Sequence, residues 1–112
     1  MDKGKQSEQV ASAYLKSLGY SVLERNYRCR FGEVDIIASK DGVLCFVEVK
    51  SLTSRWDESE ISRMVGPAKM RRIRLTAIDY LNTVDHKGRF DNTRFDIAAV
   101  TNGCVSYYEG VF

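Results

Sequence analysis

The sequence predicts an α/β protein in which a central mixed β-sheet is flanked by helices. Three observations carry this prediction: two apolar strand-like runs joined by an Asp-Gly turn, an amphipathic segment before them, and a second amphipathic segment after them. The chain has 112 residues, of which 44% are hydrophobic and 29% are charged. This length can close one hydrophobic core, so we expect a single domain over residues 1–112.

The first helix is expected over residues 7–18, with Ser7 capping its start and Gly19 ending it. Its apolar stripe consists of Val10, Ala11, Tyr14, Leu15 and Leu18. Residues 20–29 then predict a strand, in which residues 24–26 are expected to be irregular.

Residues 32–38 and 43–50 are apolar, β-branched runs that Asp41 and Gly42 join as a hairpin. We expect them to be antiparallel neighbours. Their nearly continuous hydrophobicity indicates that both faces are covered, so these strands should be central, with helices on both sides of the sheet.

Residues 51–66 are polar and without a repeating pattern, which predicts a long loop, here called the flap, that is mobile or functional. Pro67 is well placed to open a second helix, which extends to about residue 82. Its inward residues are expected to be Met70, Ile73, Ala77, Ile78 and Leu81. Residues 94–100 and 104–108 predict a second hairpin, so the order of elements is αβββαββ.

Several classes of function are disfavoured. The three cysteines are far apart and include no Cys-x-x-Cys pair, which argues against zinc and against a disulfide framework. The only histidine, His86, lies in a polar turn, which argues against His-based catalysis. We expect a soluble, cytoplasmic protein without a membrane partner, because we find neither a bilayer-spanning apolar stretch nor a signal peptide. The net charge is only +2, so any nucleic-acid surface must be local.

Three charged residues are embedded in the central strands. Side chains alternate along a strand, so Glu48 and Lys50 share a face, and Asp35 projects opposite to its apolar neighbours on the adjoining strand. A charge in such surroundings is costly unless it is paired or holds a cation. We therefore expect these three side chains to converge on one site.

Two carboxylates held close together take up a proton or a cation. Because no His or Cys is available, we expect a hard ion, Mg²⁺ or Mn²⁺, on Asp35 and Glu48, with waters and the Val49 carbonyl completing its shell. Such an ion lowers the pKa of bound water and neutralises charge on a phosphate. Lys50 would orient that water or stabilise the attacked phosphate.

The pattern Gly32-Glu33-Val34-Asp35, followed by Glu48-Val49-Lys50, resembles the bipartite Asp…(Asp/Glu)-x-Lys motif of restriction-endonuclease-like nucleases. Nearly the whole chain resembles the YraN family, which comprises small bacterial predicted endonucleases related to archaeal Holliday-junction resolvases. Further motifs that carry this resemblance are Glu8, residues 23–28, Lys69 and residues 94–97.

The resemblance implies a restriction-endonuclease-like αβββαβ core with metal ligands at Asp35 and Glu48 and a catalytic Lys50. It also implies that Glu8 reaches in from the first helix as an accessory acid. Lys69 falls where related nucleases often carry a Lys or Gln that touches the site.

Other interpretations stay open for these residues. A Glu-x-Lys pair alone is typical of an exposed ion pair, and an acid such as Glu8 in the first turn favours any helix dipole. Glu33 is expected to face away from Asp35, and Asp96 is expected to be structural. Trp56 in the flap could stack on a base or anchor the loop.

Basic residues gather before the motif strand and along the second helix. Such a face is usually only solvated, but beside a metal-carboxylate site it would bind phosphates in a salt-dependent manner. The candidates for nucleic-acid contact are Arg25, Arg28, Arg30, Arg63, Arg71, Arg72 and Arg74.

These features predict Mg²⁺-dependent hydrolysis of phosphodiester bonds in DNA, including branched or junction DNA. Because one such site cuts one strand, paired incision would require a two-fold homodimer. Two alternatives remain: a nuclease-fold module that binds nucleic acid without turnover, and a structural partner in a larger assembly.

Overall fold

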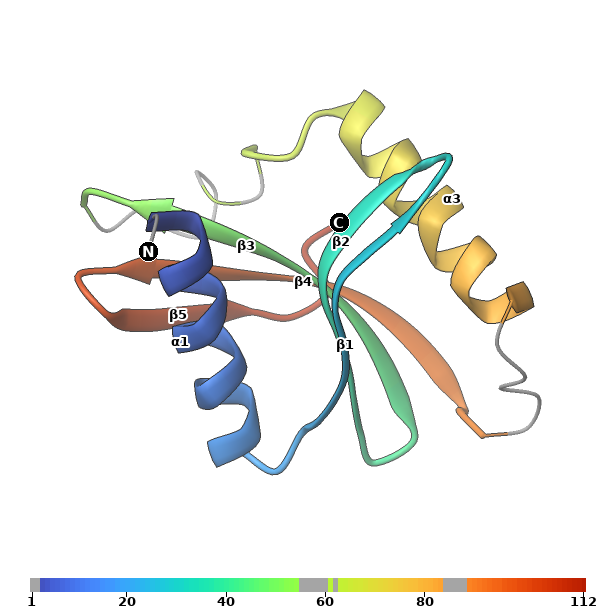
Figure 1. Ribbon diagram of the computed structural model, residues 1–112, viewed down its shortest axis with the longest axis horizontal. Coiled ribbons are helices and arrows are strands. Elements are labelled where there is room, and N and C mark those ends of the chain that lie inside the picture. Colours follow the sequence, from blue (N-terminus) through green and yellow to red (C-terminus); the bar gives the residue numbers. More distant parts are fainter. Residues whose placement is uncertain (1–2, 55–60, 62, 84–88) are drawn as a thin grey trace.

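The computed structural model describes residues 3–54, 61, 63–83 and 89–112. Its elements follow the predicted αβββαββ order (Figure 1): α1 (Lys3–Ser17), β1 (Ser21–Cys29), β2 (Gly32–Lys40), β3 (Val43–Leu52), α3 (Pro67–Thr83), β4 (Asn92–Thr101) and β5 (Cys104–Tyr108). Among the described residues, no helix is both long and apolar enough to cross a bilayer.

The strands form one mixed sheet in the order β1-β2-β3-β4-β5. Neighbouring strands are antiparallel except for β3 and β4, which are parallel. A parallel pair needs a crossover connection, and α3 lies in this one. The predicted α/β class with a central mixed sheet is therefore confirmed.

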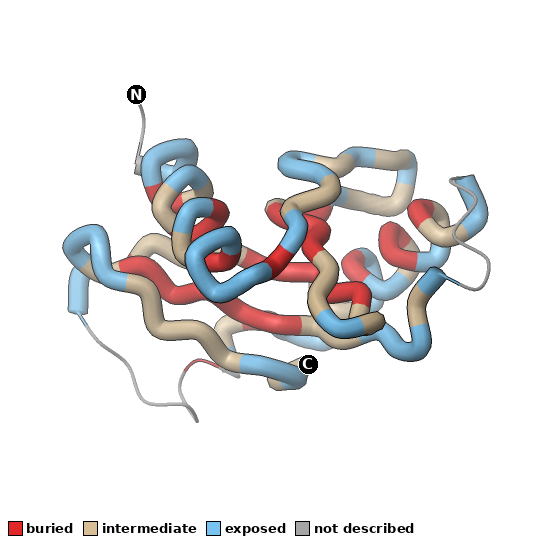
Figure 2. The backbone as a smooth tube through the Cα atoms, turned by 90° about the horizontal axis from the view of Figure 1, so that it is seen from below, coloured by how far each residue is buried: buried red, intermediate tan, exposed pale blue. Residues whose placement is uncertain are grey.

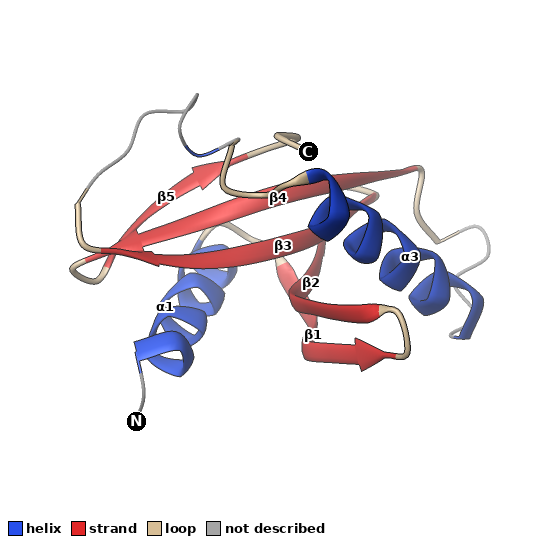
Figure 3. Cartoon of the chain, turned by 90° about the horizontal axis from the view of Figure 1, so that it is seen from above, coloured by secondary structure: helices blue, strands red, loops and turns tan. Residues whose placement is uncertain are grey.

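Helices α1 and α3 cover opposite faces of this sheet (Figures 1 and 3). Alternation along β3 sends Phe46 toward Ile73 of α3 and Val47 toward Leu15 of α1. Both faces of β3 are thus apolar, which explains its nearly continuous hydrophobic run. Figure 2 shows the buried segments gathered in the middle of the molecule, with exposed turns outside.

Helix α1 differs from the predicted helix at both ends. It begins at Lys3 rather than Ser7. The sequence did not predict this earlier start, because residues 4–6 are exposed and show no apolar periodicity. Ser7 is therefore not an N-cap; it is buried within the helix, where its Oγ and the Oγ of Ser51 on β3 share a hydrogen bond. Leu18 lies beyond the end of the helix and is 43% exposed, so its place in the apolar stripe was wrong.

Helix α3 begins at Pro67 as predicted, but its buried stripe differs in part. Ile73, Ala77 and Tyr80 face the core, whereas Ile78 is 54% exposed because it lies one helical step of about 100° beyond Ala77. Thr76 is also buried, which is possible because its hydroxyl donates to the Arg72 carbonyl at 2.8 Å.

The predicted flap is described only in part. Strand β3 continues through Leu52, and Ile61 and Val65 are buried in the core against α3. The end of the flap therefore packs as core, and only a tertiary contact reveals this, because its apolar residues are isolated in a polar sequence. Trp56 and the acidic run at residues 57–60 lie outside the described residues, as does His86.

Asp96 on β4 is structural, as expected. Its carboxylate is fully buried and accepts hydrogen bonds from Arg94 at 2.9 Å, from the Tyr107 hydroxyl at 2.5 Å and from the Gly110 N–H at 2.8 Å. Arg94 also donates to the Tyr20 hydroxyl at 2.8 Å. This network ties the C-terminal segment to the sheet, and it satisfies a charge that would otherwise be costly to bury.

Candidate active site

Asp35 and Glu48 lie on neighbouring strands at the point where β2 and β3 stop pairing. The ladder runs from Lys40 and Val43 to Ile36 and Val47, so the two acids are the next facing positions. Beyond the last ladder pair, the backbone N–H of Val49 on β3 donates to the side chain of Asp35, with its nitrogen 2.8 Å from Oδ2. This bond fixes the Asp35 carboxylate against β3.

The two acids line an open pocket of about 200 Å³ together with Glu33, Ile73 and two basic residues of α3, Lys69 and Arg72. The Nζ of Lys69 lies 3.3 Å from Oε2 of Glu48, whose side chain is only 9% exposed. The sheet and α3 thus hold opposite charges close together at the edge of the core.

Lys50 follows two positions after Glu48 and interacts with both the acids and Lys69. Burial lowers the pKa of Lys50, and the hydrogen-bonded Lys69 lowers it further, although Glu48 and Asp35 oppose this. Burial also acts to lower the pKa of Lys69, but its hydrogen bond with Lys50 and the carboxylates outweigh burial and raise it. Lys69 therefore keeps its proton, and Lys50 is the amine that gives one up more readily.

Glu48 holds a proton more tightly than an ordinary glutamate. Burial is the largest cause that raises its pKa to about 8, followed by the hydrogen bond and the charge of Asp35, while Lys69 and Lys50 oppose the rise. Without a cation, two such carboxylates are relieved by sharing a proton.

We expect the metal-free protein to lose stability as the pH rises from about 4.5 to about 8. Between the ordinary pKa of 4.5 and the folded pKa of about 8, the folded state keeps a Glu48 proton that the unfolded chain releases. Raising the pH through this window therefore favours unfolding, by up to about 1.4 kcal/mol per pH unit. Urea unfolding in chelator at a series of pH values measures the slope. Glu48→Gln should flatten it, and equal slopes in the two proteins would contradict the expectation.

Glu8 reaches toward the same acids from α1. Burial raises its pKa most, and the charge of Asp35 adds to this, while a hydrogen bond from the Asn26 side chain and the charge of Arg25 oppose it. Its Oε1 is buried and has no hydrogen-bond partner in the described part of the chain. A buried acceptor without a partner is costly, so this oxygen is suited to a cation or a proton.

These oxygens fit a hard divalent cation. The carboxylates of Asp35 and Glu48 and the orphaned oxygen of Glu8 are the donor type that Mg²⁺ and Mn²⁺ take. Within the described ranges, no group of three or more Asp, Glu, His or Cys side chains is placed so that it could hold a metal ion. Magnesium usually keeps several waters and uses one or two carboxylates, so an open arrangement suits it.

The structure brings together all the acids and amines that the sequence predicts for the site: Asp35, Glu48, Lys50, Lys69 and Glu8. Val49 lies beside Asp35, but its observed contact is made by the N–H and not by the carbonyl that the sequence predicts as a metal ligand. The catalytic and metal-binding roles of these residues are still predictions.

The expectation that Glu33 faces away from Asp35 is wrong, because both line the same pocket. Alternation separates neighbours along a strand, whereas residues two apart share a face, so the signal was present in the sequence. Glu33 forms an ion pair with Arg28, in which Nε of Arg28 lies 2.6 Å from Oε2 of Glu33. This pair holds the guanidinium of Arg28 next to the pocket.

Three of the predicted nucleic-acid-binding arginines lie near the acids. Arg72 lines the pocket, Arg28 adjoins it through Glu33, and the charge of Arg25 acts on Glu8. All seven predicted arginines are exposed, and the other four, all within the described ranges, show no contact with the pocket: Arg63, Arg71, Arg74 over Phe95 at 5.9 Å, and Arg30 over Phe31 at 4.8 Å. The first three arginines are therefore best placed to contact a phosphate near the acids.

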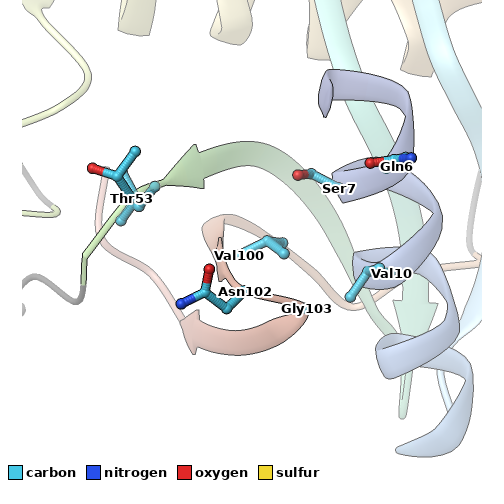
Figure 4. A pocket seen from close by; sticks show the side chains of 8 residues that line it. Gln6, Ser7, Val10, Thr53, Val100, Asn102 and Gly103 are labelled. Carbon is cyan, nitrogen blue, oxygen red and sulfur yellow. The ribbon is translucent and has the colours of Figure 1, made fainter. Parts of the chain in front are cut away.

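A second pocket, of about 310 Å³, lies between α1, the end of β3 and the β4–β5 turn (Figure 4). Its described lining is uncharged: Gln6, Ser7, Val10, Leu52, Thr53, Val100, Asn102 and Gly103. None of the predicted site residues contributes to it, whereas the smaller, charged pocket is lined by Asp35, Glu48 and Lys69.

A mixed α/β sheet flanked by helices, with an acid on β2 and Glu-x-Lys on β3, defines a protein compatible with a restriction-endonuclease-like core. The chain belongs to the Uncharacterised protein family UPF0102, the YraN family, whose model matches residues 7–100.

Curated relatives agree with this assignment. A UPF0102 protein of Syntrophus aciditrophicus is 48% identical over 107 residues, which cover 90% of this chain and 80% of the relative. One from Persephonella marina is 41% identical over 113 residues, covering 98% and 92%. Another, from Kosmotoga olearia, is 41% identical over 113 residues, covering 99% and 93%. These names state the family and no activity.

Proposed function

We propose that this protein hydrolyses phosphodiester bonds in DNA with the help of Mg²⁺, or Mn²⁺ in its place. The observation that carries the proposal is the pair formed by the buried Glu48 and the half-buried Asp35, which opens into a pocket beside Lys50 and Lys69. Mutually repelling carboxylates at the edge of a core lower stability, and such a cost is typical of functional sites; a hard cation is the partner that relieves the repulsion.

Asp35 and Glu48 would hold the ion, with the Val49 N–H fixing the orientation of Asp35 and Glu8 adding an oxygen from α1. When bound, the ion would neutralise charge on the phosphate and acidify a nearby water.

The two lysines would have different roles, one toward the attacking water and the other toward the phosphate. Lys50, whose pKa is lowered by burial and by Lys69, is suited to orient the attacking water and take up its proton. Lys69, whose pKa is raised, keeps its positive charge and is suited to stabilise a phosphate oxygen.

The proposed substrate is DNA, including branched or junction forms. Arg72 lines the pocket and Arg28 adjoins it through Glu33, so both can bind the backbone phosphates that flank the cut. One site cuts one strand, so we propose that paired incision uses a homodimer.

Cleavage assays test this function with labelled duplex, flapped, four-way and single-stranded DNA. We expect cleavage with Mg²⁺ or Mn²⁺ and none with chelator, and we expect Lys50→Ala to lose cleavage but keep binding. Cleavage that persists in chelator would contradict the proposal.

A second candidate is a nuclease-fold module that binds nucleic acid without turnover. It is favoured by the contact between Lys69 and Glu48, which satisfies one acid without a metal. It is also favoured because no three Asp, Glu, His or Cys side chains among the described residues are placed so that they could hold a metal ion. Salt-dependent DNA binding without cleavage under every metal condition would support this candidate.

A further inference from the structure

Asn26 has an unusual backbone for a residue within a strand. Its φ is 56°, in the left-handed region, although it lies in the interior of β1. The other described non-glycine residues with positive φ, Asp41 and Asn102, lie in hairpin turns, where this conformation is ordinary. A strained backbone in a strand persists only where its surroundings hold it, and such residues gather at functional sites.

Asn26 lies opposite Asp35. Arg25 pairs with Ile36 and Tyr27 pairs with Val34, so Asn26 and Asp35 occupy the position between two ladder pairs without forming one. The hairpin bends at this point: Val34 packs in the core on the α3 side and Ile36 in the core on the α1 side, although a regular strand would send both to one face. The left-handed residue therefore sits at the bend that carries the candidate metal ligand.

The side chain of Asn26 is directed to the acid that α1 contributes. Its carboxamide donates a hydrogen bond to the carboxylate of Glu8, and the charges of Asp35 and Glu33 act on that same carboxylate. The Oε1 atom of Glu8 is left buried and without a partner in the described residues. One hydrogen bond thus connects β1 to α1 and orients a carboxylate whose other oxygen stays available.

We propose that Asn26 is a positioning residue, whose left-handed backbone aims its carboxamide at Glu8 and thereby holds the Glu8 carboxylate beside Asp35. The part of this inference that concerns metal binding rests on the proposed function. The contact with Glu8 does not depend on it.

Glycine separates the two contributions of Asn26. Asn26→Gly tolerates positive φ, so it keeps the bend and removes only the carboxamide. Asn102→Gly is the matched control, because Asn102 has a similar φ of 50° in the β4–β5 turn and the substitution likewise removes a carboxamide. Glu8→Gln, alone and combined with Asn26→Gly, shows whether Asn26 acts through Glu8.

The first measurement uses the full-length, metal-free protein. The side-chain amide resonances of Asn26 in ¹H–¹⁵N spectra should move strongly in Glu8→Gln and stay in place in Asn102→Gly.

The second measurement is Mn²⁺ affinity by calorimetry, together with thermal unfolding. Asn26→Gly should bind Mn²⁺ about tenfold more weakly, as is usual when a residue that orients a ligand is removed. It should unfold within a few degrees of the wild type, and it should add no further loss to Glu8→Gln.

The proposal would be overturned if the Asn26 amide resonances do not shift in Glu8→Gln. It would also be overturned if Asn26→Gly lowers Mn²⁺ affinity equally in the wild type and in the Glu8→Gln background. Wild-type protein that binds no Mn²⁺ while the Asn26 resonances respond to Glu8 would support the positioning contact and overturn the metal-dependent function.

Discussion

Glu48→Gln is expected to abolish DNA cleavage, with a loss of at least about 10²–10³-fold, while DNA binding and the fold persist. Glutamine keeps the shape of the buried side chain and removes its charge. Because the pKa of Glu48 is raised to about 8 without a cation, glutamine resembles the protonated carboxyl that the metal-free protein already holds near neutral pH. The change should therefore remove the ion's binding site without leaving an unpaired charge in the core.

Single-turnover cleavage at saturating Mg²⁺ and a gel-shift assay in chelator measure the two effects. Glu24→Gln is a suitable control, because Glu24 is an exposed acid on β1 outside the pocket lining. Cleavage by Glu48→Gln at a rate close to that of the control would remove the central support for the nuclease proposal.

Asp96→Ala is expected to destabilise the fold by about 3–5 kcal/mol. The substitution removes the Asp96 carboxylate that pairs with Arg94, whose side chain is only 25% exposed. It also leaves the Tyr107 hydroxyl and the Gly110 N–H without their hydrogen-bond acceptor. Breaking a buried ion pair by removing one partner is costly because the other charge stays in the core. Urea unfolding at constant pH measures the loss.

Glu109→Gln provides the matched control for this network. The Glu109 side chain is 58% exposed and lies 3.3 Å from Arg94, so its loss should cost less than about 1 kcal/mol. Should Asp96→Ala fail to fold, Tyr107→Phe removes a single hydrogen bond and should cost about 1–2 kcal/mol. A loss for Asp96→Ala no larger than that for Glu109→Gln would mean that the network is not the support we describe.

Much of the fold could be predicted because its signals are local. The apolar runs of β2 and β3 are joined by Asp41 and Gly42, whose left-handed backbones suit a tight hairpin. The same alternation that makes β3 buried on both faces also places Glu48 and Lys50 on one side of it. Element order, sheet class and the acid-lysine motif follow from such spacing.

Predictions of individual side chains were less complete, for reasons that can be traced. Ser7 has the chemistry of an N-cap, yet a partner on a distant strand lets it lie inside the helix. Ile61 and Val65 are too isolated in sequence to show periodicity, but they fill the core beneath α3. Ile78 is apolar yet exposed, because the helix can bury only one stripe.

By itself, the sequence determined the order of the elements, the mixed sheet and the placement of Asp35, Glu48 and Lys50 on adjoining strands, because alternation and turn chemistry act over a few residues. Only the tertiary structure decided that β2 and β3 part at the acids, that Lys69 meets Glu48 at 3.3 Å, and that Asn26 adopts a left-handed backbone beside Glu8. These features arise where segments far apart in the chain meet, and the charge and strain they hold are offset by the packing of the whole core.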